Sequence, residues 1–336
     1  MNWLITGGCG FLGTSLIKHL ATEGGHKIRV IDNLSVGTRD DLAAVSGFIE
    51  LNPSELAGII PSPTQGEGWG EGAEVQLIVG DILDEALALS VAKGAEVIVH
   101  LAANTGVGPS VENPRLDCVT NVIGTFNYLE SARHSKVKRF IFASSGAPIG
   151  ECEPPIHEEK VPHPVSPYGA SKLAGEGYCS AYFRTFGIET VALRFGNVYG
   201  PGSGHKNSVI AKFIKQILDG ETLEIYGDGK QTRDFIFIDD LVNAVCLATT
   251  KAEDGGEIFQ IATNAETTVS GILKLLIAEF DKRGVRGITH VNSTPRIGDV
   301  MRNFSDTAKA KRMLGWKPKI SLNIGIGLTL DYFMSK

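Results

Sequence analysis

Tyr168 and Lys172 stand four residues apart in the run Tyr-Gly-Ala-Ser-Lys, so both side chains lie on one face of any helix that carries them. This pairing can make an acid/base catalyst of a tyrosine. A free phenol has a pKa of about 10, whereas a nearby ammonium stabilises its anion. Lowering the pKa by about three units takes roughly 4 kcal/mol, which one close ammonium and a second positive charge could supply in a dry cleft. Because one such pair also occurs by chance, the surrounding elements must decide its meaning.

A glycine-rich turn at residues 6–13 joins an apolar strand at residues 3–5 to a helical pattern of apolar residues. Glycines let the backbone approach a pyrophosphate, and the start of a helix offers free N–H groups to its charge. Gly8-x-Gly10-x-x-Gly13 satisfies the dinucleotide-binding fingerprint. In this strand–turn–helix order, dinucleotide binding is favoured over a plain surface loop.

The next apolar strand, residues 28–32, ends in Asp32, nineteen residues after Gly13. A carboxylate at this position is expected to hold the adenosine ribose. Asp32 would repel a 2′-phosphate, and Asn33-Leu34-Ser35 contains no arginine that could bind one. The sequence therefore predicts NAD rather than NADP as the dinucleotide.

Further motifs run along nearly the whole chain. In chain order, they are Gly7-x-x-Gly10-x-x-Gly13, Gly80-Asp81-Ile82, His100-Leu101-Ala102-Ala103, Asn121-Val122-Ile123-Gly124-Thr125, Ser144-Ser145, Tyr168 to Lys172, Arg194-Phe195-Gly196-Asn197, Gly227 to Phe235, Arg296-x-Gly298-Asp299 and Leu314-Gly315-Trp316-Lys317-Pro318. In these motifs and their order, the chain resembles the extended short-chain dehydrogenases/reductases that act on nucleotide sugars, and among them UDP-glucose 4-epimerase and similar UDP-sugar epimerases.

The resemblance implies a catalytic set of Ser145, Tyr168 and Lys172. Tyr168 would take the proton of the sugar's 4-hydroxyl while a hydride passes from C4 to NAD⁺. Ser145 would hydrogen-bond the reacting hydroxyl, with Ser144 as its structural neighbour, and Lys172 would hold the nicotinamide ribose. The 4-keto sugar would then turn its other face to the cofactor and regain the hydride with inverted configuration. Because no net redox change occurs, NAD should stay bound.

The resemblance also implies which residues contact cofactor and substrate. The predicted cofactor-binding residues are Gly7, Gly10, Phe11, Leu12, Gly13, Asp32, Asn33, Asp81, Ile82, Leu101, Ala102, Ala103, Asn121, Tyr168 and Lys172. The predicted substrate-binding residues are Ser145, Asn197, Arg233, Arg296 and Asp299, with the arginines on the diphosphate and Asp299 near the nucleoside ribose. No metal site is predicted. His100 is interpreted as a packed or capping histidine, and His205 and Lys206 as candidate contacts of the sugar.

The residues that follow Ser145 separate the activities of this family. Nucleotide-sugar 4,6-dehydratases place Asp-Glu directly after their catalytic threonine, where this chain has Gly146-Ala147, and this difference argues against dehydration. Pro148-Ile149-Gly150 replaces the usual Val-Tyr-Gly. The sequence therefore does not decide whether the sugar of the substrate is glucose, a uronic acid, an N-acetylated hexosamine or a deoxysugar. An NAD-linked UDP-glucuronate decarboxylase or reductase is an alternative. So is a catalytically silent NAD-binding regulator, which would be expected to lack one of the three catalytic residues.

Apolar strands alternate with helical patterns and predict an α/β fold, a Rossmann-type doubly wound parallel sheet with a smaller C-terminal α/β substrate lobe. We expect an NAD-binding domain at 1–194 and a mainly nucleotide-sugar-binding lobe at 195–336, part of it crossing back to the sheet. The glycines and prolines of about 47–75 predict a mobile insertion, either a lid over the adenine end or a tolerated loop. The expected strands are 75–79, 97–100, 139–143 and 189–193, and the expected helices lie near 113–134, 167–187, 207–219, 239–250, 268–281 and 322–334.

Composition agrees with a large globular enzyme, since 43% of the 336 residues are hydrophobic. No apolar run reaches the ~18 residues that a bilayer needs, and the first strand begins too early to follow a signal peptide, so we expect a cytoplasmic protein without a membrane partner. Five cysteines without Cys-x-x-Cys spacing predict reduced thiols. A net charge of −6 argues against nucleic acid as a partner. The resemblance implies a homodimer, paired through the helices near 113–134 and 167–187.

Overall fold

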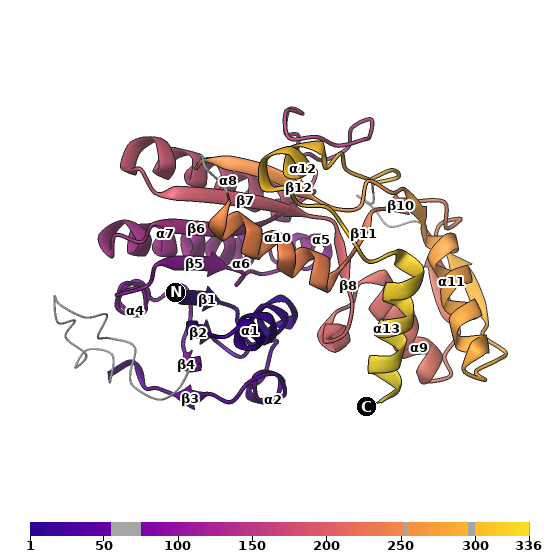
Figure 1. Ribbon diagram of the computed structural model, residues 1–336. Helices are drawn as coiled ribbons and strands as arrows, with labels where there is room; N and C mark the ends of the chain where they lie inside the picture. Colours follow the sequence, from indigo (N-terminus) through magenta and orange to yellow (C-terminus); the bar gives the residue numbers. More distant parts are fainter. Residues whose placement is uncertain (55–74, 252–254, 295–299, 336) are drawn as a thin grey trace.

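The computed structural model describes residues 1–54, 75–251, 255–294 and 300–335. Within these residues, eight parallel strands form one sheet that carries helices on both faces (Figure 1). From one edge to the other, the strands are β12 (Glu257–Ile261), β7 (Glu189–Phe195), β6 (Arg139–Ser145), β5 (Val97–His100), β1 (Asn2–Thr6), β2 (Lys27–Asp32), β4 (Val75–Val79) and β3 (Ile49–Glu50). The predicted α/β fold with a doubly wound parallel sheet is confirmed.

The strand order reverses beside β1, which has β2 on one side and β5 on the other. In such sheets, ligands bind beyond the carboxyl ends of the strands at the point of reversal. The turn after β1 holds the glycines, and the turn after β5 holds Leu101 and Ala102. The topology therefore brings these two predicted cofactor segments together.

The predicted strands 75–79 and 97–100 agree with β4 and β5, whereas β6 and β7 each extend two residues beyond the predicted 139–143 and 189–193. The extension of β6 makes Ser145 its last residue, paired in register with Phe195 of β7. Ser145 is therefore held by the sheet and not by a loose loop.

Two apolar clusters cover the two faces of the sheet, because alternate residues of each strand point to opposite sides. Trp3 and Ile5 of β1 pack on one side, and Leu4 packs on the other. The helices on the first side are α1 (Phe11–Glu23), α2 (Arg39–Ala43), α10 (Ile238–Thr250) and α12 (Ala308–Leu314), and those on the second side are α4 (Glu85–Val91), α7 (Gly124–His134) and α8 (Pro167–Phe186).

The helix expected near 113–134 is present as three consecutive segments. They are α6 (Pro114–Cys118), a π-helical turn η1 (Val119–Ile123) and α7. Short α5 (Val107–Glu112) precedes them. Single π-helical turns inside helices frequently mark functional sites. Asn121, one of the predicted cofactor residues, lies in this turn.

The second lobe contains α9 (Val209–Leu218), α11 (Val269–Lys282) and α13 (Leu322–Met334), which Figure 1 shows side by side near the C-terminus. All three agree with the predicted helices within two residues. Short strands complete the lobe and pair as β8 (Asn197–Tyr199) with β11 (Phe235–Phe237), β9 (Leu223–Tyr226) with β14 (His290–Ser293), and β10 (Thr232–Arg233) with β13 (Thr267–Thr268).

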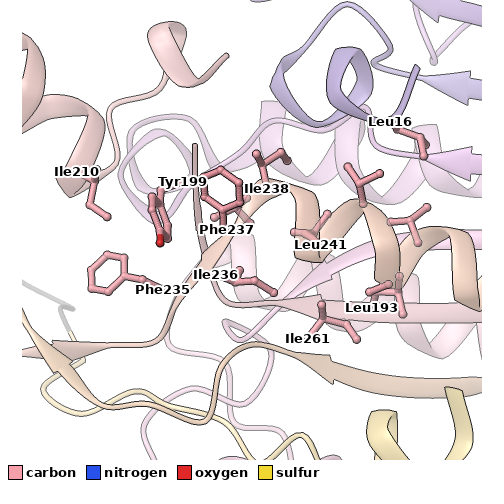
Figure 2. Close-up of a cluster of buried hydrophobic side chains, with 14 of the residues drawn as sticks. Leu16, Leu193, Tyr199, Ile210, Phe235, Ile236, Phe237, Ile238, Leu241 and Ile261 are labelled. Carbon is pink, nitrogen blue, oxygen red and sulfur yellow. The ribbon is translucent and has the colours of Figure 1, made fainter. Parts of the chain in front are cut away.

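One continuous apolar cluster joins the second lobe to the sheet. Figure 2 shows Leu193 and Ile261 of the sheet, Ile236 of β11, and Tyr199 and Ile210 of the second lobe in the same cluster. Because the two lobes share this core, the groups that each contributes to a site keep a fixed separation.

Residues 257–261 come after the first segments of the second lobe, yet they pair with β7 at the edge of the sheet. The predicted boundary at 194/195 stays a prediction. Within the predicted insertion at 47–75, residues 49 and 50 form the edge strand β3, and residues 55–74 lie outside the described residues. Of the helices in the described ranges, none has both the length and the apolar character needed to cross a bilayer.

Trp316 gives a test of how the C-terminal segment is held. Its side chain is 1% exposed, and its indole N–H donates to the Asp240 carbonyl of α10 at 2.9 Å. We expect Trp316→Ala to lower the free energy of unfolding by about 3–5 kcal/mol, because it leaves a large cavity. Urea unfolding followed by circular dichroism measures this change. Leu328→Ala, at a side chain that is 44% exposed, is the control and should change the free energy by less than about 0.5 kcal/mol. A loss no larger than that of the control would show that the segment is not anchored by Trp316.

Candidate active site

The glycine turn after β1 is closed so tightly that side chains do not fit. Gly7 has φ +68°, and a Cβ on it would lie 2.8 Å from the backbone nitrogen of Ala102. A Cβ on Gly13 would lie 2.4 Å from the Cα of Gly8. Helix α1 begins at Phe11, and Gly10 at its N-cap provides no capping side chain, so the first N–H groups of the helix are left for a ligand. The turn therefore fits a dinucleotide pyrophosphate, with Phe11 and Leu12 at the start of the helix.

Asp32 lies directly beside this turn. Its carboxylate accepts hydrogen bonds from the backbone N–H of Cys9 and of Leu34, at 2.9 Å each. Burial raises the pKa of Asp32, and the two backbone hydrogen bonds oppose that rise. Next to it, the Asn33 amide donates to the Asp81 carboxylate at 3.0 Å. The structure thus brings Asp32, Asn33 and Asp81 to the carboxyl ends of β2 and β4, where an adenosine would lie.

Ile82, which follows Asp81, packs against α7. A Cβ on Gly124 would lie 2.4 Å from the Ile82 Cδ1 atom, and the Ile82 carbonyl accepts from the Asn127 amide at 3.0 Å. The described contacts of Ile82 are therefore with α7, and a contact of Ile82 with the cofactor stays a prediction.

The turn after β5 is fixed by Thr6 at the end of β1. The Thr6 hydroxyl oxygen accepts from the backbone N–H of Leu101 and of Ala102, at 3.1 Å each. Ala103 continues this half-buried turn. The contacts with Thr6 and Gly7 hold Leu101 and Ala102 against the glycine turn, and Ala103 follows them.

His100 is packed, as the sequence interpretation expected. Its Nδ1 lies 3.0 Å from the Thr6 hydroxyl, and its Nε2 lies 3.2 Å from the Thr125 hydroxyl. Burial, and secondarily the charge of Lys172, lower the pKa of His100 to about 3, so the ring is neutral at physiological pH. Since Thr6 Oγ1 already accepts two N–H groups, it donates to Nδ1, which leaves Nε2 to donate to Thr125.

Asn121 uses every polar atom of its side chain inside the protein. Its oxygen accepts from the Asn104 backbone N–H at 2.8 Å, and its nitrogen donates to the Asn104 carbonyl and to Asp117, both at 2.9 Å, and to Ser171 Oγ at 3.1 Å. The amide thus ties the loop after β5 to α6 and α8. The contacts that the structure gives Asn121 are therefore within the protein, and its role at the cofactor stays a prediction.

The three predicted catalytic residues converge at the carboxyl end of β6. Helix α8 begins at Pro167, which follows the capping residue Ser166, so Tyr168 and Lys172 lie in its first two turns. Ser145 forms a side-chain hydrogen bond with Tyr168. The Lys172 ammonium donates to the Ala143 carbonyl at 2.9 Å and lies 5.9 Å from the centre of the Tyr168 ring.

A lowered pKa of Tyr168 is expected when the lysine and a second positive charge both lie beside it, whereas in the protein alone the pKa of Tyr168 is raised to about 12. Burial is the largest cause, the hydrogen bond with Ser145 lowers the pKa, and the Asp117 charge raises it. Burial also lowers the pKa of Lys172 to about 8, against the raising effects of Asp117 and Glu176. The Lys172 ammonium donates its hydrogen bond to the Ala143 carbonyl and not to Tyr168. Lowering the pKa of Tyr168 therefore requires a second positive charge beside it.

The Ser144 side chain contacts Glu176 and not Tyr168 or Lys172, as its assignment to a structural role requires. Its hydroxyl donates to Glu176 at 2.6 Å, and Arg194 makes two hydrogen bonds of 2.7 Å to the same carboxylate. Glu176 and Arg194 are each 2% exposed. Removing one partner of a buried ion pair leaves an uncompensated charge, so this pair fixes the position of α8 against β6 and β7.

The predicted substrate residues come from the second lobe. Asn197 is half-buried at the start of β8, and its backbone N–H donates to the Asp234 carbonyl at 2.7 Å. The Arg233 guanidinium donates to the carbonyls of Thr232 at 2.6 Å and Val300 at 2.7 Å. Arg296 and Asp299 lie outside the described residues, directly before Val300.

Sequence reasoning missed several residues that shape the site. They are Thr6, Asn104, Asp117 and Asn303. The Asn303 side chain is the nearest group to Gly146, since a Cβ on that glycine would lie 3.7 Å from Asn303 Nδ2. Thr6 had a usable signal in its place directly before the first glycine, but Asn303 lies far from Gly146 in the sequence and no motif connects them.

His205 and Lys206 lie beside the glycine turn. His205 Nε2 is 3.0 Å from the Asp41 carboxylate of α2, and Lys206 Nζ is 5.3 Å from the centre of the Phe11 ring. These two side-chain contacts are with the N-terminal part of the chain, and contact with a sugar stays a prediction.

A model of the NAD dependent epimerase/dehydratase family matches residues 3–262. The chain belongs to this family. Its sequence is 35% identical over 333 residues to a putative UDP-glucose 4-epimerase of Methanocaldococcus jannaschii, which covers 98% of this chain and 97% of that protein. The resemblance inferred from the motifs and the prediction of NAD as cofactor are both confirmed.

Solved structures of family members superpose closely. The UDP-glucose 4-epimerase of Thermotoga maritima with UDP-glucose has a TM-score of 0.86 and 35% identity, covering 100% of this chain and 99% of that one. The dTDP-glucose 4,6-dehydratase DesIV of Streptomyces venezuelae, with NAD bound, also has a TM-score of 0.86, at 28% identity, covering 100% of this chain and 98% of that one. Since both enzymes fit this fold equally well, the residues of the site must distinguish epimerisation from dehydration.

The tight glycine turn leads to a prediction about NAD binding. In Gly13→Ala the new Cβ would overlap the Gly8 backbone, so the turn must open and NAD affinity should fall by more than about tenfold. Isothermal titration of the cofactor-free protein with NAD measures the affinity. Gly177→Ala in α8, where a Cβ meets open space, is the matched control. Equal affinities of the two variants would contradict a phosphate site at this turn.

Proposed function

We propose that this protein is an NAD-dependent epimerase of a nucleotide sugar, which inverts C4 of a UDP-hexose through a transient 4-keto sugar. The observation that carries the proposal is the convergence of Ser145, Tyr168 and Lys172 at the end of β6. The sequences and structures of family members named as 4-epimerases support it.

The residues have separate roles in the proposed reaction. Tyr168 takes the proton of the 4-hydroxyl and later returns it, and Ser145 holds that hydroxyl by a hydrogen bond. Bound NAD would supply a reversible hydride acceptor for C4 of the sugar. Lys172 contributes its charge from beneath Tyr168 and holds the nicotinamide ribose. Because the hydride and the proton both return, the reaction is redox-neutral and NAD stays bound between turnovers.

The second lobe binds the nucleotide diphosphate in this proposal. Arg233 and Arg296 neutralise the diphosphate, helped by Asn197, and Asp299 lies near the nucleoside ribose. The bonds from Arg233 to the Thr232 and Val300 carbonyls support this assignment, because they aim the guanidinium and connect it to the chain that carries Arg296 and Asp299.

Dehydration is disfavoured by the local chemistry at Gly146 and Ala147. A 4,6-dehydratase needs an acid and a base beside the catalytic hydroxyl residue. Gly146 and Ala147 have no acidic or basic group that could transfer a proton. Gly146 faces the neutral Asn303 amide. A UDP-glucuronate decarboxylase or reductase and a silent NAD-binding regulator remain the alternatives, and the complete catalytic set counts against the regulator.

Tyr168→Phe tests the assignment of the acid/base. Without the phenol oxygen, turnover should fall by at least about 10²- to 10⁴-fold, while NAD remains bound because the ring and its neighbours are kept. Turnover is measured by proton NMR of UDP-sugars, and bound NAD by its release on denaturation. Unchanged turnover would remove Tyr168 from the mechanism, whereas loss of NAD together with activity would show a binding role instead.

We also propose that the protein is a homodimer, and the expected cytoplasmic location likewise stays a proposal. Large apolar side chains are exposed on neighbouring helices that the resemblance pairs across a two-fold axis. They include Leu116 (49% exposed), Ile123 (47%), Tyr178 (40%) and Phe186 (48%). Contacts between α6, η1, α7 and α8 place these residues on one helical layer.

Charges on this layer should separate the dimer. We expect the double variant Ile123→Glu/Tyr178→Glu to elute at the 35.9 kDa of one chain and the parent protein at about twice that mass in size-exclusion chromatography with light scattering. Ile324→Glu, at a residue of α13 that is 58% exposed, is the control and should stay dimeric. A monomeric parent protein, or a dimer that survives both charges, would rule out this interface.

A further inference from the structure

A segment of the second lobe reaches across to the glycine turn. This segment, residues 201–206, contains the 3₁₀ turn η2 (Ser203–His205) and is called the clasp below. A Cβ on Gly202 would lie 3.3 Å from the Phe11 ring, and His205 lies 3.0 Å from Asp41. The clasp therefore contacts both the start of α1 and the start of α2, although it lies more than 150 residues away in the sequence.

The clasp is held in shape by its own hydrogen bonds. The Ser203 hydroxyl donates to the Gly200 carbonyl at 2.7 Å, and the Lys206 backbone N–H donates to the Ser203 carbonyl at 2.9 Å. From α9, the Lys215 ammonium donates to the carbonyls of Gly204 at 3.2 Å and Lys206 at 3.0 Å. These bonds fix the backbone on which the Lys206 side chain stands.

The Lys206 side chain is half-buried, and no carboxylate of the described residues is paired with its ammonium. It lies over the face of the Phe11 ring, which attracts cations weakly. Burial lowers the pKa of Lys206 to about 8, and among the described residues no acidic group counteracts this effect. A charged side chain in such a place usually has an anionic partner, since an unpaired charge is costly to bury.

The nearest candidate for that partner is the ligand of the glycine turn. Phe11 is the first residue of α1, whose N-terminal N–H groups lack a side-chain cap. An anion on these N–H groups would lie beside the ring that Lys206 covers. A helix N-terminus and a fixed ammonium together bind a phosphate more strongly than either alone.

We propose that Lys206 is a diphosphate-binding residue of the cofactor site, and that the clasp covers the NAD pyrophosphate from the side of the second lobe. The substrate carries the same chemical group, but the position of Lys206 on Phe11 favours the pyrophosphate of NAD. The inference rests on the proposed cofactor site and not on epimerisation, because its readout is the binding and release of NAD.

The test uses Lys206→Met, which keeps all but the last atom of the side chain's length and removes the charge. One charge-assisted hydrogen bond corresponds to a loss of about 10- to 100-fold, so the dissociation constant for NAD should rise by that factor. Lys206→Arg should restore most of the affinity. Lys93→Met, at an exposed lysine at the end of α4, is the charge-matched control and should bind NAD like the parent protein. Thermal unfolding of each cofactor-free variant verifies that its fold is intact.

A second variant tests the clasp itself. His205→Ala removes the side-chain contact with Asp41 and leaves Lys206 in place. We expect NAD to dissociate about two- to fivefold faster, in line with the loss of one exposed side-chain hydrogen bond. Stopped-flow displacement of bound NAD by a fluorescent analogue measures this rate.

The outcomes separate the possibilities. If Lys206→Met binds NAD like the parent protein but weakens inhibition by UDP, the ammonium meets the substrate diphosphate and the inference is wrong. Unchanged binding of both NAD and UDP would also overturn it, because Lys206 would then bind neither diphosphate. If the parent protein itself fails to bind NAD, the proposed cofactor site fails first, whatever the variants do.

Discussion

The site is organised around a buried ammonium. Lys172 is 3% exposed, so its charge must be compensated by its surroundings or be lost. The Ala143 carbonyl accepts its hydrogen bond, the Phe142 ring lies 4.9 Å below it, and the carboxylates of Asp117 and Glu176 raise its pKa from a greater distance. Each carboxylate is itself held, Asp117 by Asn121 and Glu176 by Arg194 and Ser144. The charge of Lys172 is thus linked, through these two carboxylates, to residues of α6, α8, β6 and β7.

The parallel sheet makes this arrangement possible, because it delivers the ends of neighbouring strands to one edge. The turn after β1 carries the glycines, the turn after β5 is pinned by Thr6, and β6 ends at Ser145. A short chain of hydrogen bonds runs from Thr6 through the neutral His100 to Thr125 and the carbonyl of Asn121. These hydrogen bonds therefore connect the glycine turn with the π-helical turn η1 beneath the site.

Local patterns in the sequence predicted most of the fold. The glycine spacing, the Tyr168/Lys172 pair and the apolar strands are short-range signals, and the structure places all of them as expected. The raised pKa of Tyr168 in the protein alone could not be predicted from the sequence, because burial depends on the packed structure, and the lowered pKa expected with a second positive charge stays a prediction. Contacts between residues far apart in the sequence could not be predicted either. Asn303 beside Gly146, and His205 beside Asp41, join segments that no sequence motif connects.

The most direct test of the account is proton NMR of the purified protein with each C4 epimer of a UDP-sugar, without added reductant. UDP-glucose, UDP-N-acetylglucosamine and UDP-glucuronate are the first substrates to compare, each with its galacto epimer. The account predicts that one pair reaches the same final ratio from either side, and that deuterium placed on C4 is retained in the product because the same hydride returns. A 4-keto-6-deoxy sugar, a pentose from the uronate, or no change with every pair while NAD stays bound would contradict C4 epimerisation of these UDP-sugars.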